Sequence, residues 1–231
     1  MPRRSPTAWI VGGVIALIVV VAAVVAIASS GGDDGGNDAN GGSSPLPSAA
    51  AGTGGPSNGD SGSAIQQNRP VMVSGTPLTT FDADQTDGSI GAVIPTVTGE
   101  GFDGTPVTIA PGTPTLVAFV AHWCPHCQRE VPRLVQWHAD GQVPAGVDVI
   151  AVSTAVTDQR DNYPPSDWLQ REQWPWPVMA DSANTDAANA FGLSSFPYFV
   201  MYGADGKVLF RESGEIPMDE LTSKINDALG R

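Results

Sequence analysis

The chain has two cysteines, Cys124 and Cys127, and their setting constrains the fold more than any other feature. They follow an apolar run at residues 115–120 and precede residues 128–139, in which apolar side chains recur at helical spacing. A strand that leads into Cys-x-x-Cys and then into an amphipathic helix is typical of a redox dithiol at a helix N-terminus. We therefore expect the fold to be built around this strand-to-helix junction.

Two other uses of paired cysteines are a zinc site and a structural disulfide. A zinc site needs two more ligands, and the available histidines are His122, His126 and His138. His126 lies between the cysteines, where it could not complete a tetrahedral site without strain. A structural disulfide here would close a loop so short that it removes little entropy from the unfolded chain. We expect a redox-active disulfide between Cys124 and Cys127, with no metal and no cofactor.

The charge of the chain argues against nucleic-acid binding. Its 24 acidic residues outnumber its 11 basic residues and give a net charge of -13. No basic run follows Arg4, whereas phosphate contacts need clustered Lys and Arg. We therefore expect no nucleic-acid partner.

The N-terminal region indicates where the rest of the chain lies. Residues 8–28 carry no charge, and about 20 apolar residues span a bilayer, so this segment is predicted to be a membrane anchor. Arg3 and Arg4 precede it and Asp33 follows it, which assigns residues 1–7 to the cytoplasm by the positive-inside rule. The remainder is then extracytoplasmic.

A cleaved signal peptide is the alternative. The run Ala26-Ile27-Ala28 is an A-x-A-like cleavage site, and cleavage near Ala28 would release a secreted protein. The apolar region of a signal peptide is usually about 7 to 15 residues long, so the length of residues 8–28 favours a retained anchor. Both interpretations put the remaining chain in an oxidising compartment, where disulfides persist.

Residues 29–70 are predicted to form a disordered linker. They are nearly all Gly, Ser, Asn, Asp, Ala, Pro and Thr, which cannot bury enough apolar surface to offset the entropy of ordering. A flexible coil of about 40 residues has an end-to-end distance of roughly 35 Å. The linker would therefore let a folded domain at residues 71–231 reach partners while it stays near the membrane.

Residues 71–231 alternate between strand and helix patterns, which predicts an α/β sandwich with a mixed central sheet. Two short apolar runs, residues 90–97 and 106–109, flank an Asp-Gly turn within residues 99–104, which predicts a hairpin ahead of the cysteines. The other expected strands are residues 115–120, 147–152, 178–180, 198–202 and 207–211, and the expected helices are residues 125–139, 166–173, 184–191 and 218–229.

Two details of the helices can also be predicted. Ser166 is the expected N-cap of the second helix. In the first helix, side chains that recur at helical spacing should face the sheet: Val131, Leu134, Val135 and His138.

The order of elements and motifs resembles the thioredoxin superfamily. It consists of a strand, Trp-Cys-x-x-Cys, a helix interrupted by Pro132, a strand, a helix, and a proline that opens a hairpin. The early hairpin, the extra segment at residues 154–180 and the run Cys127-Gln128-Arg129-Glu130-Val131-Pro132 resemble the membrane-anchored, extracytoplasmic branch typified by TlpA and ResA. The resemblance covers residues 90–229. It implies a thioredoxin-like mixed sheet flanked by helices and the activity of a thiol-disulfide oxidoreductase.

Two positions depart from the family pattern. Many thioredoxins carry a buried Asp six residues before the first cysteine, where this chain has Ala118. The resemblance implies that Glu130 could replace it as the acid or base for Cys127; otherwise Glu130 is a solvated helix residue. The dipeptide Pro125-His126 resembles the oxidant DsbA rather than the Gly-Pro of thioredoxin or the Pro-Pro common in TlpA-like reductases.

The resemblance also implies roles for the dithiol and its neighbours. Cys124, at the exposed helix N-terminus, would be the nucleophile, because free N–H groups and the helix dipole favour its thiolate. Cys127 would resolve the mixed disulfide. His126, as a donor next to Cys124, would stabilise the thiolate and so make the disulfide more oxidising; otherwise it is an exposed helix residue. Trp123 would shield the pair, and His122 is expected at the surface.

Phe196 and Pro197 form the expected substrate groove. The resemblance implies that the peptide bond before Pro197 is cis and lies beside the cysteines. It also implies that both residues line a groove that pairs with the backbone of a substrate. By itself, a proline at the start of a strand is an ordinary edge feature.

The sequence thus predicts a membrane-tethered oxidoreductase that exchanges disulfides with extracytoplasmic protein thiols and is reset by an unidentified membrane redox partner. Pro125-His126 favours disulfide formation, whereas the TlpA-like pattern favours a reductase, for instance in cytochrome c maturation. A third interpretation, from another class, is a copper-binding or metallochaperone module that uses Cys124, Cys127 and a histidine. Copper chaperones of this superfamily usually space their cysteines by three residues.

Overall fold

The computed structural model describes residues 64–231. The expected anchor at residues 8–28 and most of the expected linker at residues 29–70 lie outside the described residues. Among residues 64–231, no helix has the length and apolar character that a membrane span requires.

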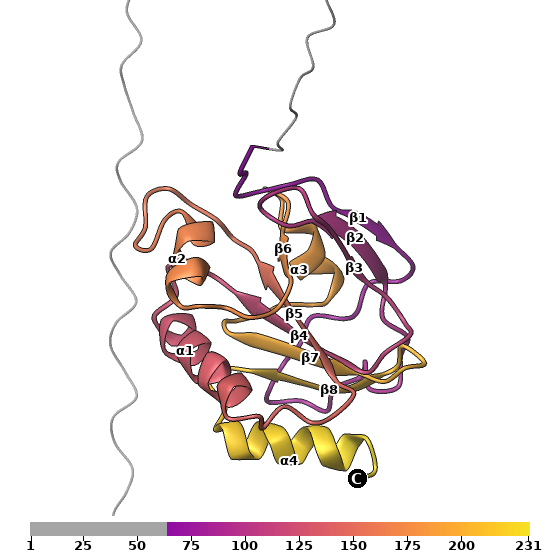
Figure 1. Cartoon of the computed structure of the whole chain (residues 1–231). Coiled ribbons are helices and arrows are strands. Elements are labelled where there is room, and N and C mark those ends of the chain that lie inside the picture. Colours follow the sequence, from indigo (N-terminus) through magenta and orange to yellow (C-terminus); the bar gives the residue numbers. More distant parts are fainter. Residues whose placement is uncertain (1–63) are drawn as a thin grey trace, which may run out of the picture. The chain divides into compact units, whose positions relative to one another are not determined.

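Within the described residues, the central sheet has five strands in the order β6-β5-β4-β7-β8 (Figure 1). They are β4 (Thr115–Val120), β5 (Asp148–Ser153), β6 (Val178–Ala180), β7 (Tyr198–Tyr202) and β8 (Val208–Ser213). β4 pairs in parallel with β5 and antiparallel with β7. Every residue of β4 is buried, as expected of a central strand covered on both faces. The predicted mixed sheet is confirmed.

Helices and a second sheet cover the two faces of the central sheet (Figure 1). The helices of residues 64–231 are α1 (Pro125–Ala139), α2 (Pro165–Arg171), α3 (Asp186–Ala190) and α4 (Met218–Ala228). Because side chains alternate along a strand, β4 contributes to both cores. Leu116 and Ala118 pack with residues of α1 and α4, whereas Val117 and Phe119 pack with α3 and the N-terminal strands.

A smaller antiparallel sheet precedes β4 in the chain. It consists of β1 (Met72–Ser74), β2 (Thr96–Glu100) and β3 (Pro106–Ile109), in that order. β2 and β3 form the predicted hairpin; β3 has the expected bounds, whereas β2 covers residues 96–100 instead of the expected 90–97. β1 was not predicted, since its three residues are all exposed and show no buried alternation. Val97 and Ile109 are fully buried and extend the core beside α3.

The segment between β1 and β2 is fastened to the end of α3. The N–H of Leu78 donates to the carbonyl of Ala190 (2.9 Å), and the N–H of Phe81 donates to that of Gly192 (2.8 Å). Gly192 has a φ of +71°, and a Cβ there would lie 2.2 Å from the carbonyl oxygen of Thr79. Both its conformation and this close approach therefore require a glycine.

The start of α2 differs from the prediction. α2 begins at Pro165, and the residue before it, Pro164, makes no side-chain capping bond. Ser166, the expected N-cap, lies in the first turn and forms two hydrogen bonds of 3.0 Å with the side chain of Gln67. The N-cap prediction is wrong because a proline, whose missing N–H costs nothing in a first turn, starts the helix one residue earlier.

The last turn of α1 differs from the prediction. Val131 and Leu134 are buried as expected, whereas His138 is exposed and Trp137 is buried. His138 is the second-last residue of α1, and its ring meets that of Trp176 edge to face at a centroid distance of 5.0 Å instead of entering the core. The expected inward orientation of His138 is therefore wrong.

Candidate active site

The dithiol lies where β4 passes into α1. Cys124 is the N-cap residue of α1, Pro125 is the first helical residue, and the N–H of Gln128 donates to the carbonyl of Cys124 (3.0 Å). Both cysteines are free thiols; Cys124 is 6% exposed and Cys127 is 0% exposed. Another molecule can therefore reach the dithiol only at Cys124, which is less exposed than the sequence indicated.

The buried thiol of Cys127 has one backbone donor and a strongly raised pKa. The N–H of Ala121 donates to its Sγ (3.5 Å). Burial raises the pKa of Cys127, and negative charge on Cys124 and Glu130 raises it further, against the effect of the Ala121 bond. Cys127 therefore keeps its proton at neutral pH and needs a nearby base to become a nucleophile.

Glu130 supplies a carboxyl group within electrostatic reach of Cys127. Its side chain is fully buried; Oε2 accepts from Arg133 Nη1 (2.9 Å), and Oε1 accepts from the N–H of Ile216 (3.1 Å). Burial raises the pKa of Glu130 despite these two bonds, and the charge of Glu215 adds to the rise. The alternative interpretation of Glu130 as a solvated helix residue is therefore wrong.

His126 lies on the exposed side of the dithiol, with Arg129 and Glu215. Its side chain is 59% exposed. Its Nδ1 is 2.7 Å from Oε1 of Glu215 and 2.8 Å from Nη2 of Arg129. Nδ1 carries a proton when it donates to Glu215 and none when it accepts from Arg129, so the two contacts belong to different states of the ring. The position of its proton therefore depends on these two neighbours.

Glu215 holds this exposed cluster together. It accepts from Arg129 Nε at Oε1 (3.0 Å), and its Oε2 is 3.5 Å from Arg133 Nη1. Hydrogen bonds from Arg129 and His126 lower the pKa of Glu215 to about 2. Glu215 in turn raises the pKa of Arg129, and the charge of Cys124 contributes to this rise. Arg129 is therefore a cation within electrostatic reach of Cys124.

Sequence reasoning assigned no role to Arg129 or Glu215. Glu215 lies between β8 and α4, 89 residues from His126, and no local pattern marks it. Arg129 did offer a signal, because a cation near the start of a helix opposes the helix dipole and is unfavourable without a partner. Only the fold brings that partner to it.

Trp123, which was expected to shield the two cysteines, is held in place beside them. Its Nε1 donates to the carbonyl of Ala155 (2.7 Å), and the guanidinium of Arg160 is 5.6 Å from its ring centroid. Its ring meets that of Phe196 edge to face, at a centroid distance of 5.9 Å. Trp123 therefore links the loop after β5 to the segment before β7.

The peptide bond between Phe196 and Pro197 is cis, as the resemblance implied. Sγ of Cys124 is 4.0 Å from the carbonyl oxygen of Phe196. Pro197 is buried, whereas Ser194 and Ser195 are exposed. The structure thus brings the expected groove residues next to the reachable sulfur, with two exposed serines directly before them.

His122 is fully buried, although a surface position was expected. Its Nδ1 is 2.7 Å from the carbonyl oxygen of Asp161, and its Nε2 accepts from the N–H of Thr157 (3.4 Å). The loop after β5 folds over the ring, which a local pattern could not indicate. His122 therefore helps to hold the same loop that accepts the hydrogen bond of Trp123.

These contacts create a dithiol with one reachable sulfur and one buried sulfur beside a carboxyl group. Such a pair can exchange disulfides in two steps, with the reachable sulfur forming the mixed disulfide. In the part of the chain that the structure describes, no group of three or more His, Cys, Asp and Glu side chains could hold a metal ion.

The chain is similar to known proteins over most of its described part. A family model described as Redoxin matches residues 90–229. A solved thiol:disulfide interchange protein of the thioredoxin family from Chlorobium tepidum TLS is 22% identical over 63% of this chain and 100% of that chain, with a TM-score of 0.50. A Neisseria meningitidis protein described as a thioredoxin is 24% identical over 60% of this chain and 90% of that chain, also with a TM-score of 0.50. At these identities the two structures show a shared fold, which confirms the predicted thioredoxin-like architecture.

Proposed function

We propose that this chain, a thiol-disulfide oxidoreductase of the Redoxin family, is an oxidant. It would form disulfides in extracytoplasmic proteins through Cys124 and Cys127. The observation that carries this proposal is the position of Cys124 as the N-cap residue of α1, with the cation Arg129 five residues further along the same helix. A cation and a helix N-terminus both stabilise a thiolate. Because the thiolate exists only in the reduced protein, its stabilisation makes the disulfide a stronger oxidant.

The proposed reaction begins when a substrate thiolate attacks Sγ of Cys124 in the disulfide form. A bond forms between the substrate sulfur and Cys124, the bond to Cys127 breaks, and Cys127 leaves with the electron pair. A second substrate thiolate then attacks the first substrate sulfur, which forms the substrate disulfide and releases Cys124 as a thiolate. Two electrons pass from the substrate to the dithiol, and the two substrate thiols give up two protons.

Glu130 is the proposed proton donor to the departing Cys127. Burial raises the pKa of Glu130, which makes its carboxyl group better able to carry a proton, and raises the pKa of Cys127, which favours proton transfer to the departing thiolate. When the proton moves from Glu130 to Cys127, the negative charge moves to a carboxylate that Arg133 and the N–H of Ile216 stabilise. In the reverse direction the carboxylate takes the proton from Cys127.

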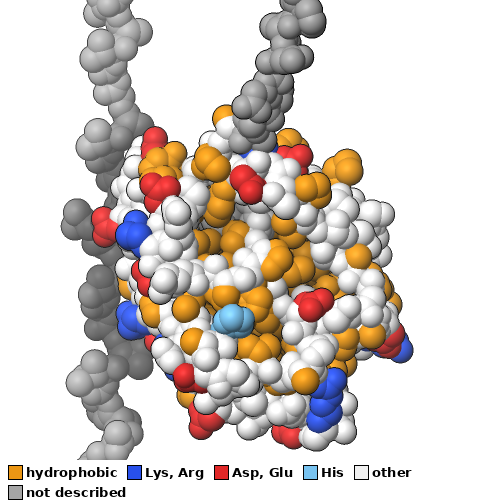
Figure 2. Space-filling model, viewed as in Figure 1, with side chains coloured by type: hydrophobic (Ala, Val, Ile, Leu, Met, Phe, Trp, Pro, Cys, Tyr) orange, Lys and Arg blue, Asp and Glu red, His pale blue; other side chains and the backbone are white. Residues whose placement is uncertain are grey.

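The proposed substrates are protein thiols. The cis segment beside Cys124 and the exposed Ser194 and Ser195 offer backbone to an extended polypeptide. Figure 2 shows hydrophobic side chains gathered across the middle of one face of the domain, with charged side chains mostly around its edge. A surface of this kind supports a polypeptide partner over a small polar one.

The proposed location depends on the sequence alone. Residues 8–28 would anchor the chain, and residues 29–70 would tether the domain outside the membrane, where disulfides persist. Cleavage near Ala28 would instead release it. To restore the disulfide after each turnover, an unidentified membrane redox partner must take two electrons from the dithiol.

A disulfide reductase is the second candidate, and the two glutamates favour it. Oε1 of Glu215 is 2.7 Å from Nδ1 of His126, and its negative charge offsets the positive charge of Arg129. The charge of Glu130 raises the pKa of Cys127. Negative charge beside a dithiol disfavours its thiolates and so lowers its oxidising power. The direction of electron flow therefore depends on whether the cations or the glutamates dominate at Cys124.

The reduction potential of the full-length chain distinguishes the two candidates. The protein is equilibrated with graded ratios of reduced and oxidised glutathione, and free thiols are trapped with an alkylating reagent and counted by mass. A potential nearer to about -120 mV, the DsbA value, than to about -270 mV, the thioredoxin value, supports the oxidant. A potential near about -270 mV contradicts it and supports the reductase. The Cys124→Ser variant is the control, because it cannot form the disulfide.

A further inference from the structure

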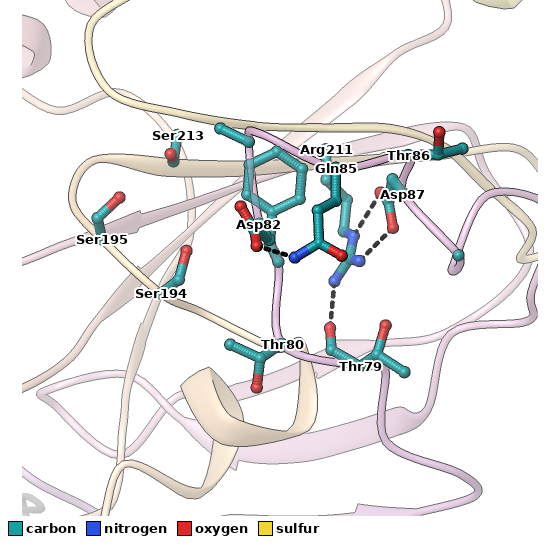
Figure 3. A pocket seen from close by; sticks show the side chains of 13 residues that line it. Thr79, Thr80, Asp82, Gln85, Thr86, Asp87, Ser194, Ser195, Arg211 and Ser213 are labelled. Atoms are coloured by element: carbon teal, nitrogen blue, oxygen red, sulfur yellow. Dashed lines mark hydrogen bonds and ion pairs between the residues drawn. The ribbon is translucent and has the colours of Figure 1, made fainter.

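An open pocket of about 620 Å³ lies beside the candidate active site. One wall is the segment at residues 79–88, between β1 and β2, and the opposite wall is Ser194 and Ser195, with Ser213 at the end of β8 (Figure 3). We name it the Asp82 pocket after the carboxylate that faces the serines in this view.

The wall at residues 79–88 is held by a buried ion pair. The side chain of Arg211 is 1% exposed; its Nη1 donates to the carbonyl of Thr79 (2.7 Å), and its Nε donates to Asp87 (2.8 Å). The hydrogen bond from Phe81 to Gly192 adds a second attachment. These contacts hold the wall of the pocket in place without a ligand. The charges of Arg211 and Asp87 neutralise each other.

The remaining charge of the pocket is the carboxylate of Asp82. Its Oδ1 accepts from the N–H of Asp84 (3.0 Å), and its Oδ2 accepts from the amide of Gln85 (Figure 3). Within residues 64–231 the structure gives it no basic partner. The other polar groups of the lining are mainly hydroxyls, which can accept hydrogen bonds: Thr79, Thr80, Thr86, Ser194, Ser195 and Ser213. A negative charge among acceptors suits a cationic group.

The pocket lies one residue from the segment that touches the reachable sulfur. Ser195, in its wall, precedes Phe196, whose carbonyl oxygen is 4.0 Å from Cys124 Sγ. An extended polypeptide advances about 3.3 Å per residue, and its side chains alternate between faces. A substrate with its cysteine at Cys124 therefore carries its next side chains on the same face about 7 Å away on either side, and one of these two directions leads toward Ser194 and Ser195.

We propose that the Asp82 pocket binds a Lys or Arg side chain of the substrate polypeptide, two residues from the reacting cysteine. This inference rests on the proposed function, because it requires that the substrates be polypeptide thiols. The segment at residues 79–88 would then determine specificity. It would favour substrates with a basic residue two positions before, or two positions after, the reacting cysteine.

The test uses the full-length chain in its disulfide form and reduced peptides with one cysteine each. The peptides carry Lys, Gln or Glu two positions before or after that cysteine, and the measured quantity is the initial rate of peptide disulfide formation. Each rate is divided by the rate of the same peptide with oxidised glutathione, which removes the effect of the neighbouring charge on the peptide thiol. Because the pocket is open to solvent, Lys on one side of the cysteine should react about two- to fivefold faster than Gln, and Glu should react more slowly.

Two variants and a matched control assign the preference to this pocket. Asp82→Asn should reduce the ratio of the Lys rate to the Gln rate to about one. Gln85→Lys, which puts a cation beside Asp82, should remove the preference or turn it toward Glu. Asp84→Asn removes the same charge two residues away, outside the lining, and should leave the ratio unchanged.

The proposal is overturned if neither side of the cysteine shows a preference for Lys. It is also overturned if Asp82→Asn keeps the preference, or if Asp84→Asn removes it equally. If the unmodified chain oxidises none of the peptides, the proposed function itself fails, which is a different result from oxidation without a preference.

Discussion

Glu130 and Glu215 are two carboxylates of one network with opposite surroundings. The side chain of Glu130 is 0% exposed and that of Glu215 is 27% exposed, and both lie next to Arg133. Burial raises the pKa of Glu130, whereas hydrogen bonds from Arg129 and His126 lower the pKa of Glu215 to about 2. The same chemical group therefore tends to hold a proton in one position and to stay charged in the other.

The difference suggests that the two sides of the dithiol have separate tasks. Glu130 lies on the side of the buried Cys127, where a proton must be given or taken during exchange. Glu215 lies with His126 and with Arg129, which is within electrostatic reach of Cys124. Variants at the two glutamates should therefore change different measurements.

The largest expected effect separates the two sulfurs themselves. Cys124→Ser should abolish exchange with a disulfide-linked peptide, because Cys127 is fully buried. Cys127→Ser should keep the attack by Cys124 but stop resolution, so that a mixed disulfide accumulates. Mass spectrometry of the full-length variants under non-reducing conditions measures both products. A mixed disulfide at Cys127 in the Cys124→Ser variant would contradict this division.

The next largest effect should follow from Glu130→Gln. The variant keeps the shape of the side chain but removes its proton exchange, so resolution of the mixed disulfide by Cys127 should slow about 100-fold. Formation of the mixed disulfide at Cys124 should keep its rate. Stopped-flow measurement of the two phases checks this, with Glu215→Gln as the matched control that leaves the second phase fast. A normal second phase in Glu130→Gln would show that another group moves the proton.

Smaller effects of opposite sign are expected on the reduction potential. Glu215→Gln removes negative charge beside His126 and Arg129 and should raise the potential by about 30 mV, which is tenfold in the equilibrium with glutathione. His126→Pro removes the ring and should lower the potential by about 30 mV. Glu212→Gln, three residues before Glu215 and in β8, is the matched control, because Glu212 pairs with Lys224. If the reduction potentials of Glu215→Gln and His126→Pro shifted in the same direction, the opposite effects assigned to Glu215 and His126 would be contradicted.

The smallest expected effects are opposite slopes of stability with pH. The pKa of Glu130 is raised from 4.5, so its stabilising contribution is present below pH 4.5 and is lost as the pH rises above that value. The pKa of Glu215 is lowered from 4.5 to about 2, so its contribution is present above pH 4.5 and is lost as the pH falls toward 2. Denaturant unfolding of the full-length chain across this range measures both slopes. Glu130→Gln should flatten the upper slope and Glu215→Gln the lower one; the reverse pattern would contradict the assigned surroundings.

The fold was largely predictable because its strands have local signatures. The buried runs at residues 115–120, 178–180 and 198–202 were assigned with the bounds that the structure has. β1 was not predicted, because its residues are all exposed and show no alternation between buried and exposed positions. The start of α2 was predicted one residue too late, because the prolines Pro164 and Pro165 give no periodic signal. The hairpin of β2 and β3 was predicted from its turn, and its place in the core came only from the fold.

The candidate site was predictable in part. The motif itself identified Cys124, Cys127 and His126, and the resemblance added Glu130 and the cis bond before Pro197. The burial of His122 and the partner of His126 were missed, because both depend on loops far away in the chain.

By itself, the sequence determined a reactive dithiol at a strand-to-helix junction, in a chain with an expected anchor and linker. Only the tertiary structure decided that Glu130 is buried, that Glu215 binds His126, and that residues 79–88 form a pocket beside Ser195. The physical reason is that secondary structure follows from the spacing of side chains along the chain. Protonation and specificity depend instead on burial and on charges brought together from distant segments.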